Sequence, residues 1–156
     1  MSYYVFVQDE KIVGKGCCKC LNENILNIEV DENLYSNVEK YTYKNGEIIL
    51  NPNYENEQAQ KERERISNLF LTRADVERGI YQAKGMDFDD ILAFVVANPP
   101  EGLDIKALKI ELKANNFYRG NPYVNAIGQL LGFTEEQLDK FFETGDYTVL
   151  LPVENV

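Results

Sequence analysis

Histidine and tryptophan are absent from this chain of 156 residues, and only three cysteines occur. Without histidine the chain lacks the commonest general base, the commonest metal ligand and any histidine-containing catalytic triad. Carboxylate or lysine chemistry stays open, but the sequence offers no pairing of a nucleophile with a base. We therefore expect no catalytic residues, no bound cofactor and a function other than catalysis.

The three cysteines lie together in the sequence CCKC, at Cys17, Cys18 and Cys20. A structural zinc site takes four nitrogen or sulfur ligands, commonly as two Cys-x-x-Cys pairs, and this cluster has neither the number nor the spacing. Clustered cysteines of this kind fit a reducing compartment better than an exported disulfide framework. We expect reduced thiols in a half-buried strand; a metal site or disulfide shared between chains is the alternative.

Long apolar runs and basic charge are also scarce. No apolar segment approaches the roughly 20 residues that a membrane-spanning helix needs. The N-terminal sequence MSYYVFVQDE has no basic region and no small-residue cleavage site. The net charge of −10 is spread along the chain, so a phosphate backbone would be repelled. These properties predict a cytosolic protein that contacts neither nucleic acid nor membrane directly.

Residues 1–53 have the pattern of a small antiparallel β-meander. Asn45-Gly46 separates two runs of β-forming residues, which is the strongest short hairpin signal because a type I′ turn needs positive φ at both central positions. Asn51-Pro52 then ends the sheet, since proline cannot donate a ladder hydrogen bond. We expect four or five strands, with extended runs at residues 3–7, 12–15, 27–30, 41–44 and 47–50.

Residues 54–70, YENEQAQKERERISNLF, predict a polar helix that connects two modules. Glu57–Lys61 and Glu62–Arg65 are favourable charge pairs at helical spacing, whereas apolar residues appear mainly at the end. A helix with so little apolar surface usually projects or bridges rather than packing centrally.

Residues 71–145 carry repeated helix start and stop signals and predict an all-α bundle of four to five short helices. The start signals are Thr72, Asp87, Asn121 with Pro122, and Thr134 with Gln137 in a capping box. Residues 104–114 fit a helix or a strand, and their good helix formers favour a helix. The helix after Asp87 is apolar nearly all round, so we expect it to be the most buried. Residues 146–156 are expected to form an extended tail, which either docks onto the helical module or trails from it. The predicted class is therefore α+β.

The segment NNFYRGNPY at residues 115–123 has the composition of a binding loop, because aromatic and arginine side chains anchor many protein interfaces. A short basic stripe at helical spacing precedes it. Together these residues are the candidate partner-binding set: Phe117, Tyr118, Arg119, Tyr123, Lys106, Lys109 and Lys113. In the alternative reading the stripe is a solvated face, the rings pack inward across a helix junction, and Arg119 caps carbonyls or pairs with an acid.

Two further patterns have simpler structural explanations. Asp87, Asp89 and Asp90 lack the glycine and terminal glutamate of a calcium loop, and they fit the cap and first turn of a helix. Residues 124–143 have the outline of a helix-turn-helix, but the second helix is rich in carboxylates that phosphates would repel. We expect neither a metal site nor a DNA-binding motif.

Three quoted stretches resemble known proteins: YTYKNGEIILNPNYENEQAQKERERI at 41–66, LTRADVERGIYQAKG at 71–85 and NNFYRGNPYVNAIGQLLGFTEEQLDKFF at 115–142. They are similar to small proteins encoded in the tail-gene region of bacteriophages and prophages of low-GC bacteria. In those proteins a short β-module leads through a charged helix into a helical C-terminal module. The resemblance implies a non-enzymatic protein without catalytic residues to carry over.

That resemblance leads us to expect a tail-associated structural or accessory protein of the host cytoplasm or the virion. It would act by contact with a protein partner, and self-association is one form of such contact. An alternative of another class is an acidic phage inhibitor of host defence, comparable to anti-CRISPR proteins. Such an inhibitor occupies a basic nucleic-acid-binding surface, since carboxylates can imitate phosphates.

Overall fold

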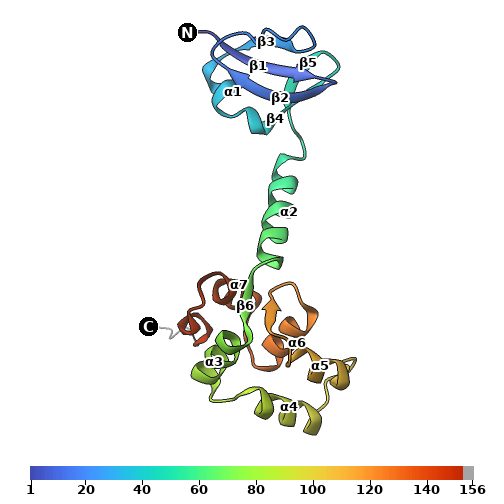
Figure 1. Cartoon of the computed structure of the whole chain (residues 1–156), viewed down its shortest axis with the longest axis vertical. Helices are drawn as coiled ribbons and strands as arrows, with labels where there is room; N and C mark the ends of the chain where they lie inside the picture. Colours follow the sequence, from blue (N-terminus) through green and yellow to red (C-terminus); the bar gives the residue numbers. More distant parts are fainter. Residues whose placement is uncertain (153–156) are drawn as a thin grey trace. The chain divides into compact units, whose positions relative to one another are not determined.

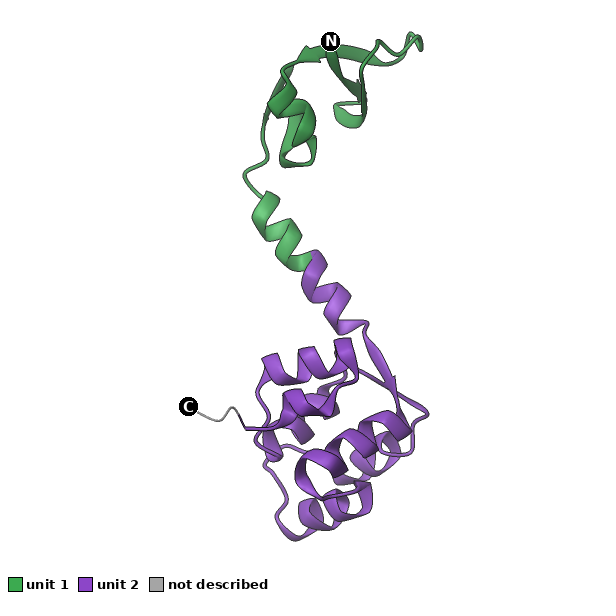
Figure 2. Cartoon of the chain, turned by 90° about the vertical axis from the view of Figure 1, so that its left-hand side faces the viewer, with its two compact units in different colours: residues 1–60 green, residues 61–156 purple. Residues whose placement is uncertain are grey.

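The computed structural model describes residues 1–152 and confirms an α+β protein (Figure 1). The chain forms two compact units, residues 1–60 and 61–156 (Figure 2). Strands dominate the first unit and helices the second. None of the helices within residues 1–152 is long and apolar enough to cross a bilayer.

The N-terminal unit begins with a three-stranded antiparallel sheet in the order β2-β1-β3. Its strands are β1 (Tyr3–Gln8), β2 (Lys11–Gly16) and β3 (Leu26–Val30). The turn between β1 and β2 places Asp9 and Glu10 at φ of 49° and 58°, the left-handed geometry of a type I′ turn. The two predicted extended runs at residues 3–7 and 12–15 therefore pair as a hairpin.

A separate hairpin follows, made of β4 (Tyr41–Lys44) and β5 (Glu47–Leu50). Asn45 and Gly46 have φ of 54° and 88°, as the predicted type I′ turn requires. All five expected strands are present, and they form two sheets rather than one. Between them lie α1 (Glu32–Ser36) and the 3-10 helix η1 (Val38–Lys40), which the sequence reading missed. Asp31 caps α1 and was the available signal.

Helix α2 (Tyr54–Ser67) matches the predicted polar helix, and none of its residues is buried. The expected pair of Glu62 and Arg65 forms at 2.7 Å, and Arg65 also lies 2.8 Å from Glu143. The predicted end of this helix at residue 70 is wrong. The chain leaves the helix after Ser67 because residues 70–72 pair with another strand.

The C-terminal unit contains five helices within the described residues, as expected, together with two short strands and a 3-10 helix. The helices are α3 (Arg73–Lys84), α4 (Phe88–Ala97), α5 (Ile105–Glu111), α6 (Pro122–Leu130) and α7 (Glu135–Thr144). The strands are β6 (Phe70–Thr72) and β7 (Asn116–Tyr118), and the 3-10 helix is η2 (Tyr147–Leu150). The strand pair was not predicted.

The predicted caps are confirmed. Thr72 accepts a hydrogen bond from the backbone N–H of Asp75, and Asp87 and Thr134 each form a reciprocal capping box. Gly85 ends α3 at φ of 70°, a left-handed conformation that glycine adopts without a steric penalty. The sequence therefore sets these helix boundaries locally.

The core of this unit is a single cluster of buried apolar side chains drawn from all five helices, β7 and η2. Gly79 makes close packing of α3 and α7 possible, because a Cβ atom at this position would lie 2.4 Å from Cζ of Phe141. Helix α4 is not the most buried, contrary to expectation. Phe94 and Val96 are 43% and 59% exposed, since only one face of α4 reaches the core.

The segment after α7 docks onto the unit, which is one of its two predicted alternatives, but the extended conformation is wrong for Tyr147–Leu150, which form a 3-10 helix. Asp146 caps η2, and Leu150 is buried in the core. An apolar side chain of this size gains from leaving water, so the chain turns back onto the unit. Residues 153–156 lie outside the described part of the chain.

Candidate protein-binding site

The strands β6 and β7 form the framework of the candidate site. They pair antiparallel, with Phe70 opposite Tyr118 and Leu71 opposite Phe117. The N–H of Arg119 donates to the carbonyl of Leu69 at 2.8 Å, so Leu69 and Arg119 are a hydrogen-bonded pair. Hydrogen-bonded and non-hydrogen-bonded pairs alternate along an antiparallel pair of strands. Phe70 and Tyr118 are therefore a non-hydrogen-bonded pair, in which opposing side chains come closest.

This strand pair separates Phe117 and Tyr118, which the sequence reading treated together. Neighbouring residues of a strand point to opposite faces. Phe117 is 3% exposed and its ring centroid lies 5.4 Å from that of Phe88, so it belongs to the core. Tyr118 is 51% exposed. The interpretation of Phe117 as a partner-binding anchor is wrong, and only Tyr118 is available to a partner.

Arg119 is a structural residue rather than an exposed anchor, which corrects a second candidate. It is 6% exposed, and its Nη1 donates to Oδ1 of Asn125 at 2.5 Å while Nη2 donates to the carbonyl of Glu135. Nε lies 2.6 Å from Oδ1 of Asp139, but its N–H direction misses the carboxylate, so the contact is an ion pair without a hydrogen bond. Arg119 thus ties β7 to α6 and α7.

Tyr123 also packs inward, against the core, and is partly buried. Its backbone N–H donates to the side chain of Asn121, the cap of α6. Three of the four candidates in residues 115–123 therefore follow the alternative reading of an internal helix junction, and the fourth does not.

An exposed aromatic pair, Phe70 and Tyr118, covers the outer face of the strand pair. The ring centroids are 5.8 Å apart, and the two residues are 55% and 51% exposed. Phe70 was missed because it was assigned to the end of the preceding helix. That Phe70 lies opposite Tyr118 follows only from the pairing of residues 70–72 with residues 116–118 as strands.

A groove of about 320 Å³ opens between α3, α4 and α5. We name it the basic groove; its lining comprises Arg73, Asp89, Lys109 and Lys113, which are exposed, and Phe88, Leu92 and Leu112, which are buried or partly buried. The charged residues form its rim and the apolar residues its floor. Two lysines of the predicted basic stripe thus meet Arg73, which the sequence reading did not connect with them. Lys106 is exposed on α5 and does not line the groove.

Arg73 is held at the rim by several contacts. Its backbone N–H donates to the carbonyl of Asn115 at 2.8 Å, and its guanidinium carbon lies 5.7 Å from the centre of the Phe88 ring. Its Nε is 3.6 Å from Oε2 of the partly buried Glu77, and a long ion pair of this kind near the surface stabilises proteins little. These contacts hold the Arg73 guanidinium at the rim, where it stays exposed to solvent.

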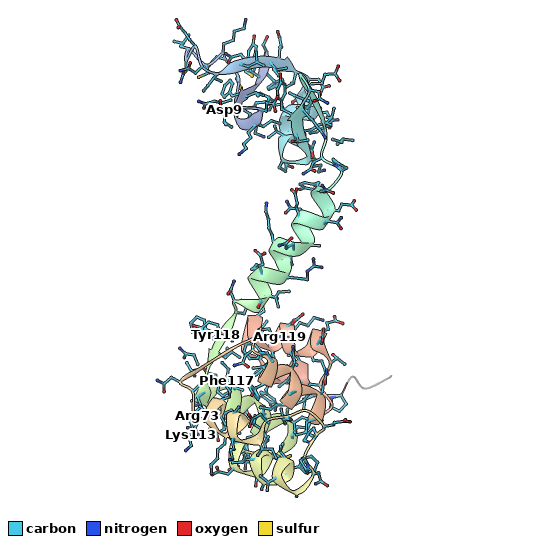
Figure 3. All side chains as sticks on the ribbon, turned by 90° about the vertical axis from the view of Figure 1, so that its right-hand side faces the viewer. Asp9, Arg73, Lys113, Phe117, Tyr118 and Arg119 are labelled. Atoms are coloured by element: carbon cyan, nitrogen blue, oxygen red, sulfur yellow. The ribbon has the colours of Figure 1, made fainter. Side chains whose placement is uncertain are left out.

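The aromatic pair and the basic groove lie at opposite ends of the same strand pair. Phe70 begins β6 and Tyr118 ends β7, whereas Arg73 follows β6 and Lys113 precedes β7. In Figure 3 the labels run in this order, from Tyr118 near the end of α2 to Arg73 and Lys113. Three residues of strand span roughly 10 Å, which is the separation of the two ends along the strand pair.

The cysteines of the N-terminal unit do not occupy a half-buried strand, contrary to expectation. β2 ends at Gly16, and the free thiols of Cys17 and Cys18 are exposed just beyond it. Sγ of Cys17 lies 3.6 Å from the Tyr35 hydroxyl, and this contact, together with burial and nearby charge, raises the pKa of Tyr35.

The acidic cluster at the start of α4 acts as a helix cap. Asp87 and Asp90 exchange side-chain and backbone hydrogen bonds, and the N–H of Asp87 donates to Asp90 at 3.1 Å. Within residues 1–152 no group of three or more His, Cys, Asp or Glu side chains is arranged to hold a metal ion.

The family model described as "Protein of unknown function (DUF2977)" matches residues 23–58. The match spans β3, α1, η1, the β4–β5 hairpin and the first turns of α2. No curated protein and no solved structure matches the chain. The segment from 23 to 58 is therefore similar to a family whose function is unknown, while the basic groove and the aromatic pair lie outside the matched residues.

Proposed function

We propose that this chain is a phage- or prophage-encoded, non-enzymatic protein that acts by binding other proteins, as a structural or accessory component of the tail locus. The resemblance of residues 41–66 and 71–142 to tail-locus proteins supports the phage origin. The proposed setting is the host cytoplasm or the virion.

One observation carries the proposal of protein binding: the solvent-facing pair of Phe70 and Tyr118 beside a groove that joins an apolar floor to a charged rim. Two half-exposed aromatic rings on a folded sheet lose little conformational entropy when a partner covers them, and tyrosine is enriched among interface residues that dominate binding energy. Binding of a protein partner accounts for this combination of features, and it does not require a catalytic residue.

The direct test is capture of partners by the tagged full-length chain from lysate of cells in which the phage or prophage is active. We expect virion components to be retained and identified by mass spectrometry. The double variant Phe70→Ser with Tyr118→Ser should retain about tenfold less, as expected for loss of an interface centre. Tyr81→Ser is the matched control, because Tyr81 is an exposed aromatic of the same unit outside the pair.

The second candidate function, an acidic inhibitor of host defence, predicts a different capture. Its support is the net charge of −10. Several carboxylates instead serve the fold: Asp104 caps α5 and Glu62 pairs with Arg65. This weakens the case for the inhibitor. Capture of a host nuclease effector without virion proteins would establish the inhibitor and contradict the tail proposal. Failure to capture either class would contradict both.

A further inference from the structure

The basic groove is positively charged on a protein that is strongly acidic overall. Arg73, Lys109 and Lys113 line it together with Asp89, and Glu77 pairs with Arg73 at 3.6 Å, so three cations against two carboxylates leave a local excess of one positive charge. The whole chain has a net charge of −10. A locally cationic groove in such a chain attracts a carboxylate-bearing ligand while the rest of the surface discourages non-specific binding of polyanions.

The cations of the groove are available to a ligand. The two lysines form no salt bridge within residues 1–152. Within residues 1–152 Arg73 forms one ion pair, at 3.6 Å, with the partly buried carboxylate of Glu77. A carboxylate that approached the rim could therefore pair with these side chains without first breaking a buried ion pair.

The floor of the groove calls for an apolar group. Phe88 and Leu112 are buried beneath it and Leu92 is partly buried. The volume of about 320 Å³ is at the small end of the range for ligand sites, about 300–1,000 Å³. It can hold one large side chain together with the backbone that carries it, and not a folded domain.

We propose that the basic groove receives an acidic segment of the protein partner, with one apolar side chain on the floor and flanking carboxylates at Arg73, Lys109 and Lys113. This assignment rests on the proposed function in one respect, namely that the partner is a protein.

Phosphate-rich ligands fit this groove less well than a peptide. The floor is apolar, Asp89 stands at the rim, and only one of the three cations is an arginine able to bind phosphate through two parallel hydrogen bonds. A nucleic acid would also extend past the groove, and the chain as a whole carries a net charge of −10 that repels phosphates. The chemistry therefore favours isolated carboxylates next to an apolar side chain.

The test uses the full-length protein and a fluorescein-labelled peptide in which a central Leu-Phe pair is flanked on each side by two glutamates. Fluorescence anisotropy at low ionic strength should show saturable binding that weakens as salt is added, because salt screens exposed charges. Lys113→Glu should weaken binding by about tenfold, since it replaces an attractive contact with a repulsive one. Lys106→Glu makes the same change in charge outside the groove, and at about 0.15 M salt, where such charges are screened beyond about 8 Å, it should weaken binding less than Lys113→Glu does.

Two altered peptides test the two parts of the assignment. Replacing the glutamates by glutamine should abolish most of the binding, and replacing Leu-Phe by Ser-Ser should weaken it. Equal binding of the wild type and Lys113→Glu, equal binding of the glutamine peptide, or no binding at all would overturn the proposal. Tighter binding of inorganic polyphosphate or of a single-stranded oligonucleotide would also overturn it, in favour of a phosphate site.

Sedimentation velocity addresses one other occupant. Self-association that Lys113→Glu removes would make a second copy of the chain the occupant and overturn the assignment to a separate partner. The capture experiment separates the two proposals: retention of virion proteins by the wild type and equally by Lys113→Glu would leave the protein-binding function standing and remove the basic groove from it.

Discussion

The two compact units of this protein differ in how they are stabilised. Residues 1–60, all of them described, bury only two apolar side chains, Val5 and Val7, whereas the described part of the second unit buries fifteen in one cluster. A chain of about 60 residues buries a smaller fraction of its surface than a longer one. Hydrogen-bonded strands and tight turns therefore contribute a larger share of the stability of the first unit. We expect the first unit to be the less stable of the two.

The largest effect should come from a core truncation in the second unit. Phe141→Ala removes a ring that packs on Gly79 and leaves a cavity, so the free energy of unfolding of that unit should fall by about 3–5 kcal/mol. Amide signals of each unit, followed by NMR during urea denaturation, would report the two transitions separately. An equal shift of the transition of residues 1–60 would contradict the division into two units.

Mutations of two neighbouring residues of the candidate site, Arg119 and Tyr118, should reduce stability by different amounts. Arg119→Ala leaves Asp139 unpaired and removes two hydrogen bonds of a buried guanidinium, and because Asp139 is partly exposed we expect a loss of about 2–3 kcal/mol. Tyr118→Ala loses only a cross-strand ring contact and should cost less than about 1 kcal/mol. Thermal unfolding measures both, and equal losses would refute the separate assignment of the two side chains.

A mutation in the sheet of the first unit should destabilise that unit and leave the second unit unchanged. Val5→Ala removes two buried methyl groups at the centre of the β2-β1-β3 sheet and should cost about 1.5–2 kcal/mol. Melting temperatures of small domains fall by about 4–8 °C per kcal/mol, so the transition of this unit should shift by roughly 10 °C while that of the second unit stays in place. Val13→Ala, at an exposed position of β2, is the control. A transition at higher temperature for the first unit than for the second would reverse the comparison.

The smallest expected effect concerns pH at the end of the second unit. Hydrogen bonds from the backbone and the hydroxyl of Thr148 lower the pKa of Asp146 below its ordinary value. Its ionised form therefore stabilises the fold above about pH 4, and this contribution is lost as the pH falls through the lowered pKa. Asp146→Asn should melt slightly below the wild type at pH 7. The two melting curves should converge in acid, and a difference that grows in acid would have the wrong sign.

Local signals account for most of the fold that the sequence predicted correctly. Asn45-Gly46 fixed a hairpin through its own backbone preferences, and Asp87 with Asp90 fixed the start of α4. Such features depend on residues within four positions of each other. The α+β class followed from them without knowledge of any long-range contact.

Two errors in the second unit have a common cause in contacts between residues distant in sequence, whereas α1 was missed despite the local signal of Asp31. Phe70 has the pattern of a helix end, and only its pairing with Tyr118 makes it part of a strand. The sequence left open whether the segment of Leu150 docks or trails, because that depends on the core that receives it. The sequence reading found Lys109, Lys113 and Tyr118 from composition, but it did not distinguish them from the buried Phe117 and Arg119, because exposure depends on that same pairing.

The pairing of β6 with β7 also bears on how the second unit folds. It joins Leu71 to Phe117 and thereby closes a loop that contains α3, α4 and α5. Loop closure costs chain entropy before the enclosed contacts can offset it, and contacts between residues distant in sequence slow folding. Two strands of three residues cannot offset that cost alone, so the core must assemble with them. We expect the solvent-facing ring pair to form in the same cooperative step as the core, so the proposed binding surface would be complete only in the fully folded unit.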